Sequence, residues 1–233
     1  MILYYHPVST ASRPILHFCA EAGIDFEPII VDLMTGEHFK QPYAAVNPNC
    51  MVPVIDDEGF VLTESSTILK YLADKFESPA YPRSLQTRAR INELMDWFNS
   101  NLYREYGYHL IYPQLLPHHR RQPEVTNRAT VEWGRVQSNI LLQTLNDHYL
   151  GRGNTCLCGN SVTLADYFGA AILSLGEIIG IDFSGYPNID RWLKVIKAMP
   201  SWIAINEAHD GFVASMKEKT FVTLEQPALT ATV

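Results

Sequence analysis

Three hydroxyl side chains gather near the start of the chain, in the stretch "HPVSTASRP". Ser9, Thr10 and Ser12 follow an apolar run and stand at the start of a predicted helix. Free N–H groups and the helix dipole favour negative charge at a helix N-terminus. A hydroxyl there can cap the helix, or it can donate a hydrogen bond to a bound thiolate and lower the pKa of that thiol. Position alone leaves both roles open for Ser9.

A role as nucleophile is not indicated for Ser9. The residue lacks the G-x-S-x-G setting of a nucleophilic serine, and no partner His or Asp can be recognised in the sequence. We therefore expect any chemistry of Ser9 to be hydrogen-bond donation to the sulfur of a ligand.

The stretch "NPNCMVPVI" could pair with such a ligand through its backbone. A cis peptide bond before Pro53 would turn the backbone groups of Val52 outward, where an extended peptide could add to them as a strand does. A trans proline that opens an edge strand is the alternative.

A second binding feature is "LTESSTILKYL", in which Glu64 and Ser65 stand between a strand and a helix. The helix N-terminus would suit a carboxylate, and Glu64 could pair with an ammonium, as an α-amino-acid head group requires. A plain helix cap fits the same spacing.

Aromatic side chains follow in the helical part of the sequence. Tyr103 and Tyr106 either belong to the core or line a cleft for an apolar ligand. Further on, Thr163 and Asp166 in "SVTLADYFGAA" have the spacing of a capping box, for which we expect a structural role.

The elements that must position these residues change character along the chain. Strand and helix signals first follow the order β-α-β, an irregular link, then β-β-α, and the first two strands should be parallel because a helix joins them. After the break "ESPAYPRS", long helical patterns predominate. We expect an α/β domain over residues 1–78, a linker over 79–86, an all-α domain over 87–210 and an extended tail over 211–233.

Composition restricts the classes of partner. A net charge of −7 argues against a nucleic-acid partner. No apolar run reaches the length of a membrane helix and no signal peptide is recognised, so we expect a cytoplasmic protein. The four cysteines fit no zinc spacing, and we expect no metal.

The motifs above occur together, in order and at matching separations, in one family. The chain resembles the cytosolic glutathione transferases of serine type over about residues 1–210. "HPVSTASRP" is similar to the phi-class motif H-P-A-S-x-A-T-R, whereas "VDLMTGEH", "VNPNCMVPVI" and "LTESSTILKYL" resemble the theta pattern. The resemblance implies a thioredoxin-like N-terminal domain, a helical substrate domain, glutathione as co-substrate and a homodimer.

The resemblance also implies roles for individual residues. Ser9 matches the hydroxyl that activates the glutathione thiol, and Tyr103 and Tyr106 would hold a small electrophilic substrate in the helical domain. The residues expected to bind glutathione are His38, Lys40, Met51, Val52, Pro53, Glu64, Ser65 and Asn99, the last of them reaching across a dimer interface.

One departure from the family pattern concerns the segment before Val52. Phi-class and dehalogenase relatives show N-P-x-G-Q-V-P, whereas this chain has Asn49-Cys50-Met51. The thioether of Met51 cannot replace the amide hydrogen bonds of a Gln. Cys50 lies close to the expected site, where its thiol could form a mixed disulfide.

Two alternatives to a conjugating enzyme remain. The chain could be a glutathione-dependent disulfide reductase or peroxidase, although "HPVSTAS" has no Cys where redox relatives carry C-x-x-C, so the disulfide would have to form with glutathione itself. It could also be a non-catalytic binding module on the same fold, against which the presence of Ser9, Glu64 and Ser65 argues.

Overall fold

The N-terminal part of the protein is built on a mixed sheet, with the strand order β2-β1-β3-β4 within the residues that the computed structural model describes, 1–225. β1 pairs in parallel with β2 and antiparallel with β3, and β4 closes the other edge. The expected β-α-β and β-β-α order is confirmed. The strands are β1 (Ile2–Tyr5), β2 (Glu27–Ile30), β3 (Val54–Asp57) and β4 (Phe60–Leu62).

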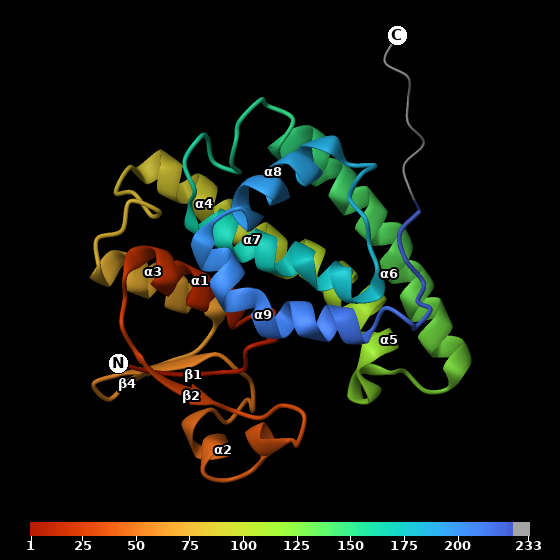
Figure 1. Ribbon diagram of the computed structural model, residues 1–233, viewed down its shortest axis with the longest axis horizontal. Coiled ribbons are helices and arrows are strands. Elements are labelled where there is room, and N and C mark those ends of the chain that lie inside the picture. The colour runs from red at the N-terminus through yellow and green to blue at the C-terminus, as the bar shows by residue number, and fades with distance from the viewer. Residues whose placement is uncertain (226–233) are drawn as a thin grey trace.

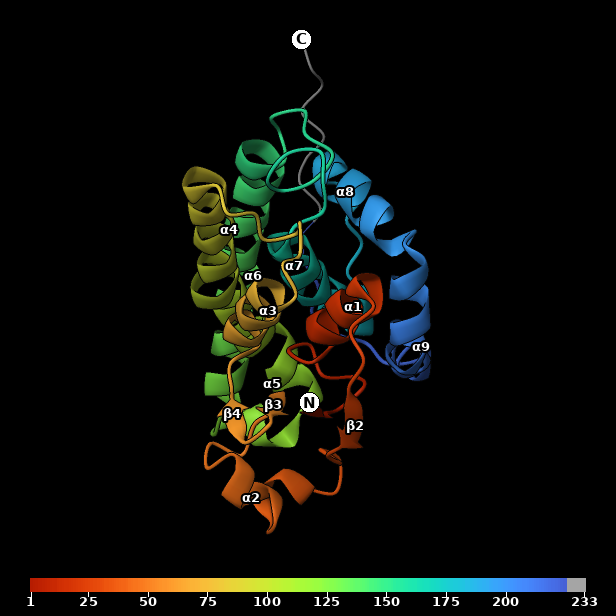
Figure 2. The ribbon, with the colours of Figure 1, turned by 90° about the vertical axis from the view of Figure 1, so that its left-hand side faces the viewer.

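Helices cover both faces of this sheet (Figure 1). α1 (Arg13–Ala22) and α3 (Ser65–Lys75) lie on the face toward the helical part, whereas η1 (Glu37–Phe39) and α2 (Tyr43–Val46) lie on the opposite side (Figure 2). α1 begins with Pro14 in its first turn and ends at Gly23, whose φ of 63° suits glycine. Because α1 is enclosed between the sheet and the helical part, every residue from Arg13 to Cys19 is buried.

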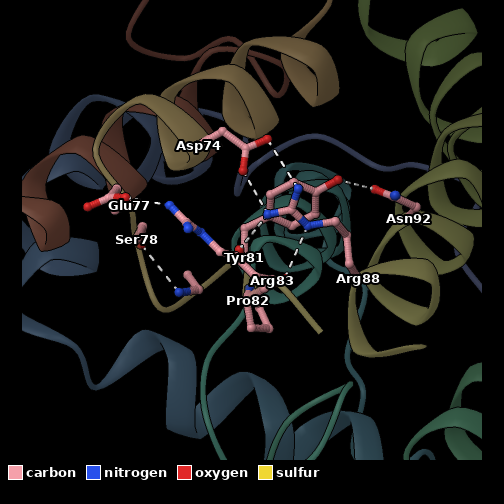
Figure 3. Close-up of polar contacts among 9 residues, drawn as sticks. Asp74, Glu77, Ser78, Tyr81, Pro82, Arg83, Arg88 and Asn92 are labelled. Carbon is pink, nitrogen blue, oxygen red and sulfur yellow. Dashed lines mark hydrogen bonds and ion pairs between the residues drawn. The ribbon is translucent and has the colours of Figure 1, made fainter. Parts of the chain in front are cut away.

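A polar cluster around Arg88 fixes the connection between the two parts (Figure 3). The guanidinium of Arg88 pairs with Asp74 on α3 at 2.7 Å and donates to the backbone carbonyls of Tyr81 and Pro82 at 3.1 Å each. It also lies over the Tyr81 ring, 4.1 Å from its centroid, and the Tyr81 hydroxyl donates to Asn92. The connecting segment is therefore held by both flanking helices.

After α3, every secondary-structure element of the described chain is a helix. Every residue of α7 (Leu164–Ser174) is buried, and the other helices surround it (Figure 1). The expected capping box is confirmed, because Asp166 Oδ2 accepts hydrogen bonds of 2.8 Å from both the backbone N–H and the hydroxyl of Thr163. The remaining elements are α4 (Leu85–Trp97), η2 (Phe98–Leu102), η3 (Arg104–Ile111), α5 (Tyr112–Leu115), η4 (Pro117–His119), α6 (Glu124–Thr144), η5 (Leu145–Tyr149), η6 (Leu175–Ile179), α8 (Pro187–Lys197) and α9 (Pro200–Ser215).

α9 continues five residues beyond the expected end of the helical domain at 210. After it, the chain runs back over α5 and α6. The Gln114 side chain makes two hydrogen bonds with the backbone of Val222, at 2.8 and 3.0 Å, and Arg135 pairs with Glu225 at 2.5 Å. The part of the predicted tail after residue 225 lies outside the described residues.

Candidate active site

A cavity of about 310 Å³ lies between the N-terminal part and the helices. Its wall combines the loop before α1, the segment before β3, the start of α3 and side chains of the helical part. The residues predicted from the sequence that line it are Ser9, His38, Met51, Val52, Pro53, Glu64, Ser65, Asn99 and Tyr103.

Ser9 stands one turn before α1, with its hydroxyl directed at the helix N-terminus. Its Oγ accepts a hydrogen bond of 3.2 Å from the backbone N–H of Ser12, and its carbonyl accepts from the N–H of Arg13 at 3.0 Å. Ser9 therefore takes part in capping, and its hydroxyl proton remains available to a ligand. Accepting a bond from the helix polarises the hydroxyl and strengthens it as a donor.

The backbone beside Pro53 is open to a peptide. The Val52–Pro53 bond is cis, and within residues 1–225 the N–H and C=O of Val52 have no hydrogen-bond partner. Val52 is itself buried, so these groups carry a cost unless a ligand or water pairs with them. Their place in the cavity wall suits the main chain of an extended peptide.

Glu64 and Ser65 form the end of the cavity at α3. Glu64 has a φ of 65° and a ψ of 109°, a strained conformation for a residue with a side chain. The next helical N–H groups belong to the first turn of α3 and have no partner inside the helix. Glu64 and the start of α3 thus line the same cavity, which suits both charges of an amino-acid head group.

His38 lines the cavity and Lys40 does not. Burial, and then the charge of His118, lower the pKa of His38, so its ring stays neutral at neutral pH. The ammonium of Lys40 donates to the carbonyl of Thr35 at 3.3 Å. The structure thus brings His38 to the cavity and leaves Lys40 outside its wall.

The segment Asn49-Cys50-Met51, which departs from the family pattern, also lines the cavity. The carbonyl of Met51 accepts from the Tyr43 hydroxyl at 2.5 Å and from Asn47 at 2.8 Å, so the backbone is fixed while the side chain is 54 % exposed. Cys50 has a φ of 54° and a half-buried thiol that lines the same wall.

The helical wall differs from the expectation for one tyrosine. Tyr106 is fully buried outside the cavity lining, and its hydroxyl donates to the carbonyl of Leu173 at 3.0 Å. Tyr103, Tyr108 and Tyr112 line the cavity instead, with ring centroids 5.2 to 6.0 Å apart. The segment η3 is a π-helix, whose i→i+5 hydrogen bonds bring residues five apart onto one face.

Sequence reasoning missed most of the remaining helical wall. Those residues come from α5, η4, the residue between these two helices, α7, η6 and α9, and no local motif marks them because only tertiary packing brings them together. They are Leu115, Leu116, His118, His119, Phe168, Ile172, Leu175, Ile178 and Phe212. The cavity is therefore polar at the N-terminal side and mainly apolar at the helical side.

Among residues 1–225, no helix is long and apolar enough to cross a membrane. The same residues contain no group of three or more His, Cys, Asp or Glu side chains arranged to hold a metal ion.

Comparison with known proteins defines the family. The chain matches the description "Glutathione S-transferase, N-terminal domain" over residues 8–75 and "Glutathione S-transferase, C-terminal domain" over residues 114–200. It is 33% identical to glutathione S-transferase theta-2 of Rattus norvegicus, covering 97% of this chain and 92% of that protein. It is 32% identical to glutathione S-transferase theta-1 of Homo sapiens, covering 89% of this chain and 87% of that protein.

Solved structures agree with these matches. The crystal structure of human glutathione transferase theta-2 with glutathione has a TM-score of 0.81 and 30% identity, covering 96% of this chain and 93% of that chain. Poplar glutathione transferase F1 shares the fold at 23% identity, with a TM-score of 0.78, over 90% of this chain and 98% of that chain. The chain belongs to the glutathione S-transferase family, and the expected fold and transferase class are confirmed.

Proposed function

We propose that this protein activates the thiol of glutathione through Ser9 and transfers the glutathionyl group to small electrophilic, mostly apolar substrates. The observation that carries this proposal is the meeting, in one cavity, of three groups that match three parts of glutathione. These are the polarised Ser9 hydroxyl, the backbone of Val52 with no partner among residues 1–225, and Glu64 beside the start of α3. Theta-class relatives in both comparisons support the same activity.

Each group has a distinct part in binding. The carboxylate of Glu64 pairs with the ammonium of the γ-glutamyl group, while the N–H groups at Ser65 receive its carboxylate. Val52 pairs with the main chain of the cysteinyl residue. Neutral His38 donates from its ring to the glycine carboxylate, and Asn99, which lines the cavity of its own chain, adds an amide on the helical side.

The chemical step takes place at the sulfur. Ser9 donates its hydroxyl hydrogen to the thiolate, and the N-terminus of α1 favours the negative charge, so the thiol pKa falls below its ordinary value of about 8.5. The thiolate then attacks the electrophilic carbon, and the leaving group departs with the bonding electron pair. Tyr103 and the apolar helical wall hold the substrate against the sulfur and exclude water.

We further propose a division into a glutathione domain (residues 1–78), a linker (79–86), a helical substrate domain (87–210) and a tail, in a cytoplasmic homodimer. A row of exposed apolar side chains on one face of α6 supports the homodimer. These are Val125, Trp133, Val136 and Ile140. Light scattering of the purified protein would give twice the chain mass of 26.4 kDa if the proposal is right, and the chain mass if it is wrong.

A substrate panel tests the proposed reaction. The purified protein is assayed with glutathione and an aryl chloride, an epoxide, an organic hydroperoxide and a glutathione mixed disulfide. Conjugation of a carbon electrophile supports the proposal. Turnover of the disulfide or the hydroperoxide alone would instead identify a reductase or a peroxidase. If calorimetry shows no binding of glutathione to the protein, the proposed reaction is wrong, and the remaining alternative is a binding module for another ligand.

A further inference from the structure

A second hydroxyl stands next to Ser9 at the boundary between the two halves of the cavity. The Tyr112 hydroxyl donates to Thr10 Oγ1 at 3.2 Å, and the Tyr103 and Tyr112 hydroxyl oxygens are 2.5 Å apart. All three residues line the cavity. Thr10 belongs to the loop before α1, whereas the two tyrosines belong to the helical wall, so the chain of hydroxyls spans the site.

The number of hydrogens in this chain of three hydroxyls decides which hydrogen can be donated to a ligand. Each hydroxyl carries one hydrogen, and Tyr112 gives its own to Thr10. Tyr103 must therefore supply the hydrogen that lies between the two phenols. Because Thr10 Oγ1 accepts at the end of this chain of hydroxyls, its own hydrogen is not needed within the chain and can be donated to a ligand.

The phenols stay protonated at neutral pH and keep this order. Burial raises the pKa of Tyr112 to about 12 and raises the pKa of Tyr103 well above its ordinary value. Bonds in such a chain polarise one another, so the two phenols make the Thr10 hydroxyl a stronger donor. Ser9 is polarised in the same way by the backbone N–H of Ser12.

We propose that Thr10 is a second hydrogen-bond donor to the glutathione thiolate, and that Tyr112 and Tyr103 are positioning residues that orient and polarise it. The inference rests on the proposed function, because it assumes that the thiolate lies beside Ser9. Its consequence is that the stability of the thiolate depends on the helical wall as well as on the loop before α1. A substrate that moves Tyr112 would change the thiol pKa.

The test is an ultraviolet titration of thiolate absorbance with glutathione bound, which reports the thiol pKa without an electrophile. Thr10→Val removes the hydroxyl at nearly constant shape, and we expect it to raise the thiol pKa by about one unit. Thr10→Ser keeps the hydroxyl and should restore the parent value. Tyr112→Phe should raise the thiol pKa by a smaller amount, because Thr10 remains but is no longer polarised.

Tyr106→Phe is the matched control, since it removes a buried phenol hydroxyl outside the cavity and should leave the thiol pKa unchanged. The inference is overturned if the thiol pKa in Thr10→Val equals that in the parent while Ser9→Ala raises it. If Thr10→Val does not fold, an unchanged thiol pKa in Tyr112→Phe overturns the inference in the same way. If Ser9→Ala also titrates as the parent does, the proposed activation by Ser9 fails as well. The two failures are therefore distinguishable.

Discussion

The guanidinium of Arg13 donates a hydrogen bond of 2.8 Å to the side-chain oxygen of Asn206, so the helix that begins beside Ser9 is tied to α9, the last helix in the described part of the chain. Arg13 also donates to Ser174 at 2.9 Å and to the carbonyl of Ala171 at 3.0 Å. All of these acceptors are neutral, and burial lowers the pKa of Arg13 to about 10, which leaves it charged at neutral pH. The start of α1 therefore depends on acceptors from α7 and α9.

Replacing Asn206 with Leu should destabilise the fold strongly, because a buried cation loses an acceptor that water cannot replace. We expect the free energy of unfolding in urea to fall by about 3 kcal/mol. Gln143→Leu, on an exposed position of α6, should change it by less than about 0.5 kcal/mol. A loss in Asn206→Leu no larger than in this control would contradict the importance of the Arg13 contact.

Replacing Glu64 with Gly should weaken the binding of glutathione and at the same time stabilise the fold. Glu64→Gly removes the partner of the glutathione ammonium, and we expect the dissociation constant for glutathione to rise at least about 10-fold. The same change relieves the backbone strain at a φ of 65°, and the free energy of unfolding should rise by about 0.5–1 kcal/mol.

Glu77 offers a matched control for that strain. It has a φ of 50°, is exposed and lies outside the cavity lining. Glu77→Gly should therefore relieve strain without changing glutathione binding. Equal effects of the two glycine variants on the dissociation constant, measured by calorimetry, would count against Glu64 as a ligand of glutathione.

His17 predicts a loss of stability in mild acid. Its side chain is 1 % exposed, neither ring nitrogen has a hydrogen-bond partner among residues 1–225, and burial lowers its pKa to about 4. Between pH 6.5 and 4 the unfolded chain binds a proton that the folded chain does not bind, so stability is full above this range and falls as pH falls through it. From pH 7.5 to pH 5, His17 should account for a loss of about 2 kcal/mol.

His17→Phe checks this attribution, because the ring keeps its edge contacts with Tyr167 and Trp202. Urea unfolding at the two pH values should show a smaller acid loss in this variant than in the parent. His148→Gln, at an exposed position, should keep the full loss. His209, whose pKa burial and the charge of Arg13 lower to about 3, leaves a remaining acid dependence in all of these proteins.

Local patterns in the sequence predict the sheet and its order well. The helix between β1 and β2 requires a parallel pair, and the short turn after Asp57 requires an antiparallel pair, as observed. Pro28 predicts an edge strand and lies in β2 at the edge of the sheet. The Val52–Pro53 bond is the cis alternative of the two that the sequence left open.

The helical wall is harder to predict, because its period changes within one helix. A period of 3.6 residues groups Tyr103 with Tyr106, whereas the π-helical segment groups Tyr103 with Tyr108 and places Tyr106 in the core. The role of Thr10 depends on a contact with Tyr112, 102 residues away in the sequence. No local pattern contains such a contact.

The central claim is that the Ser9 hydroxyl stabilises the thiolate of bound glutathione, and titration of thiolate absorbance in the Ser9→Ala variant tests it most directly. We predict that the parent protein holds the thiol pKa below about 8.5 and that Ser9→Ala raises it by one unit or more. The glutathione dissociation constant at low pH should change little, because Val52 and Glu64 still bind the peptide. An identical thiol pKa in the parent and in Ser9→Ala would contradict the account.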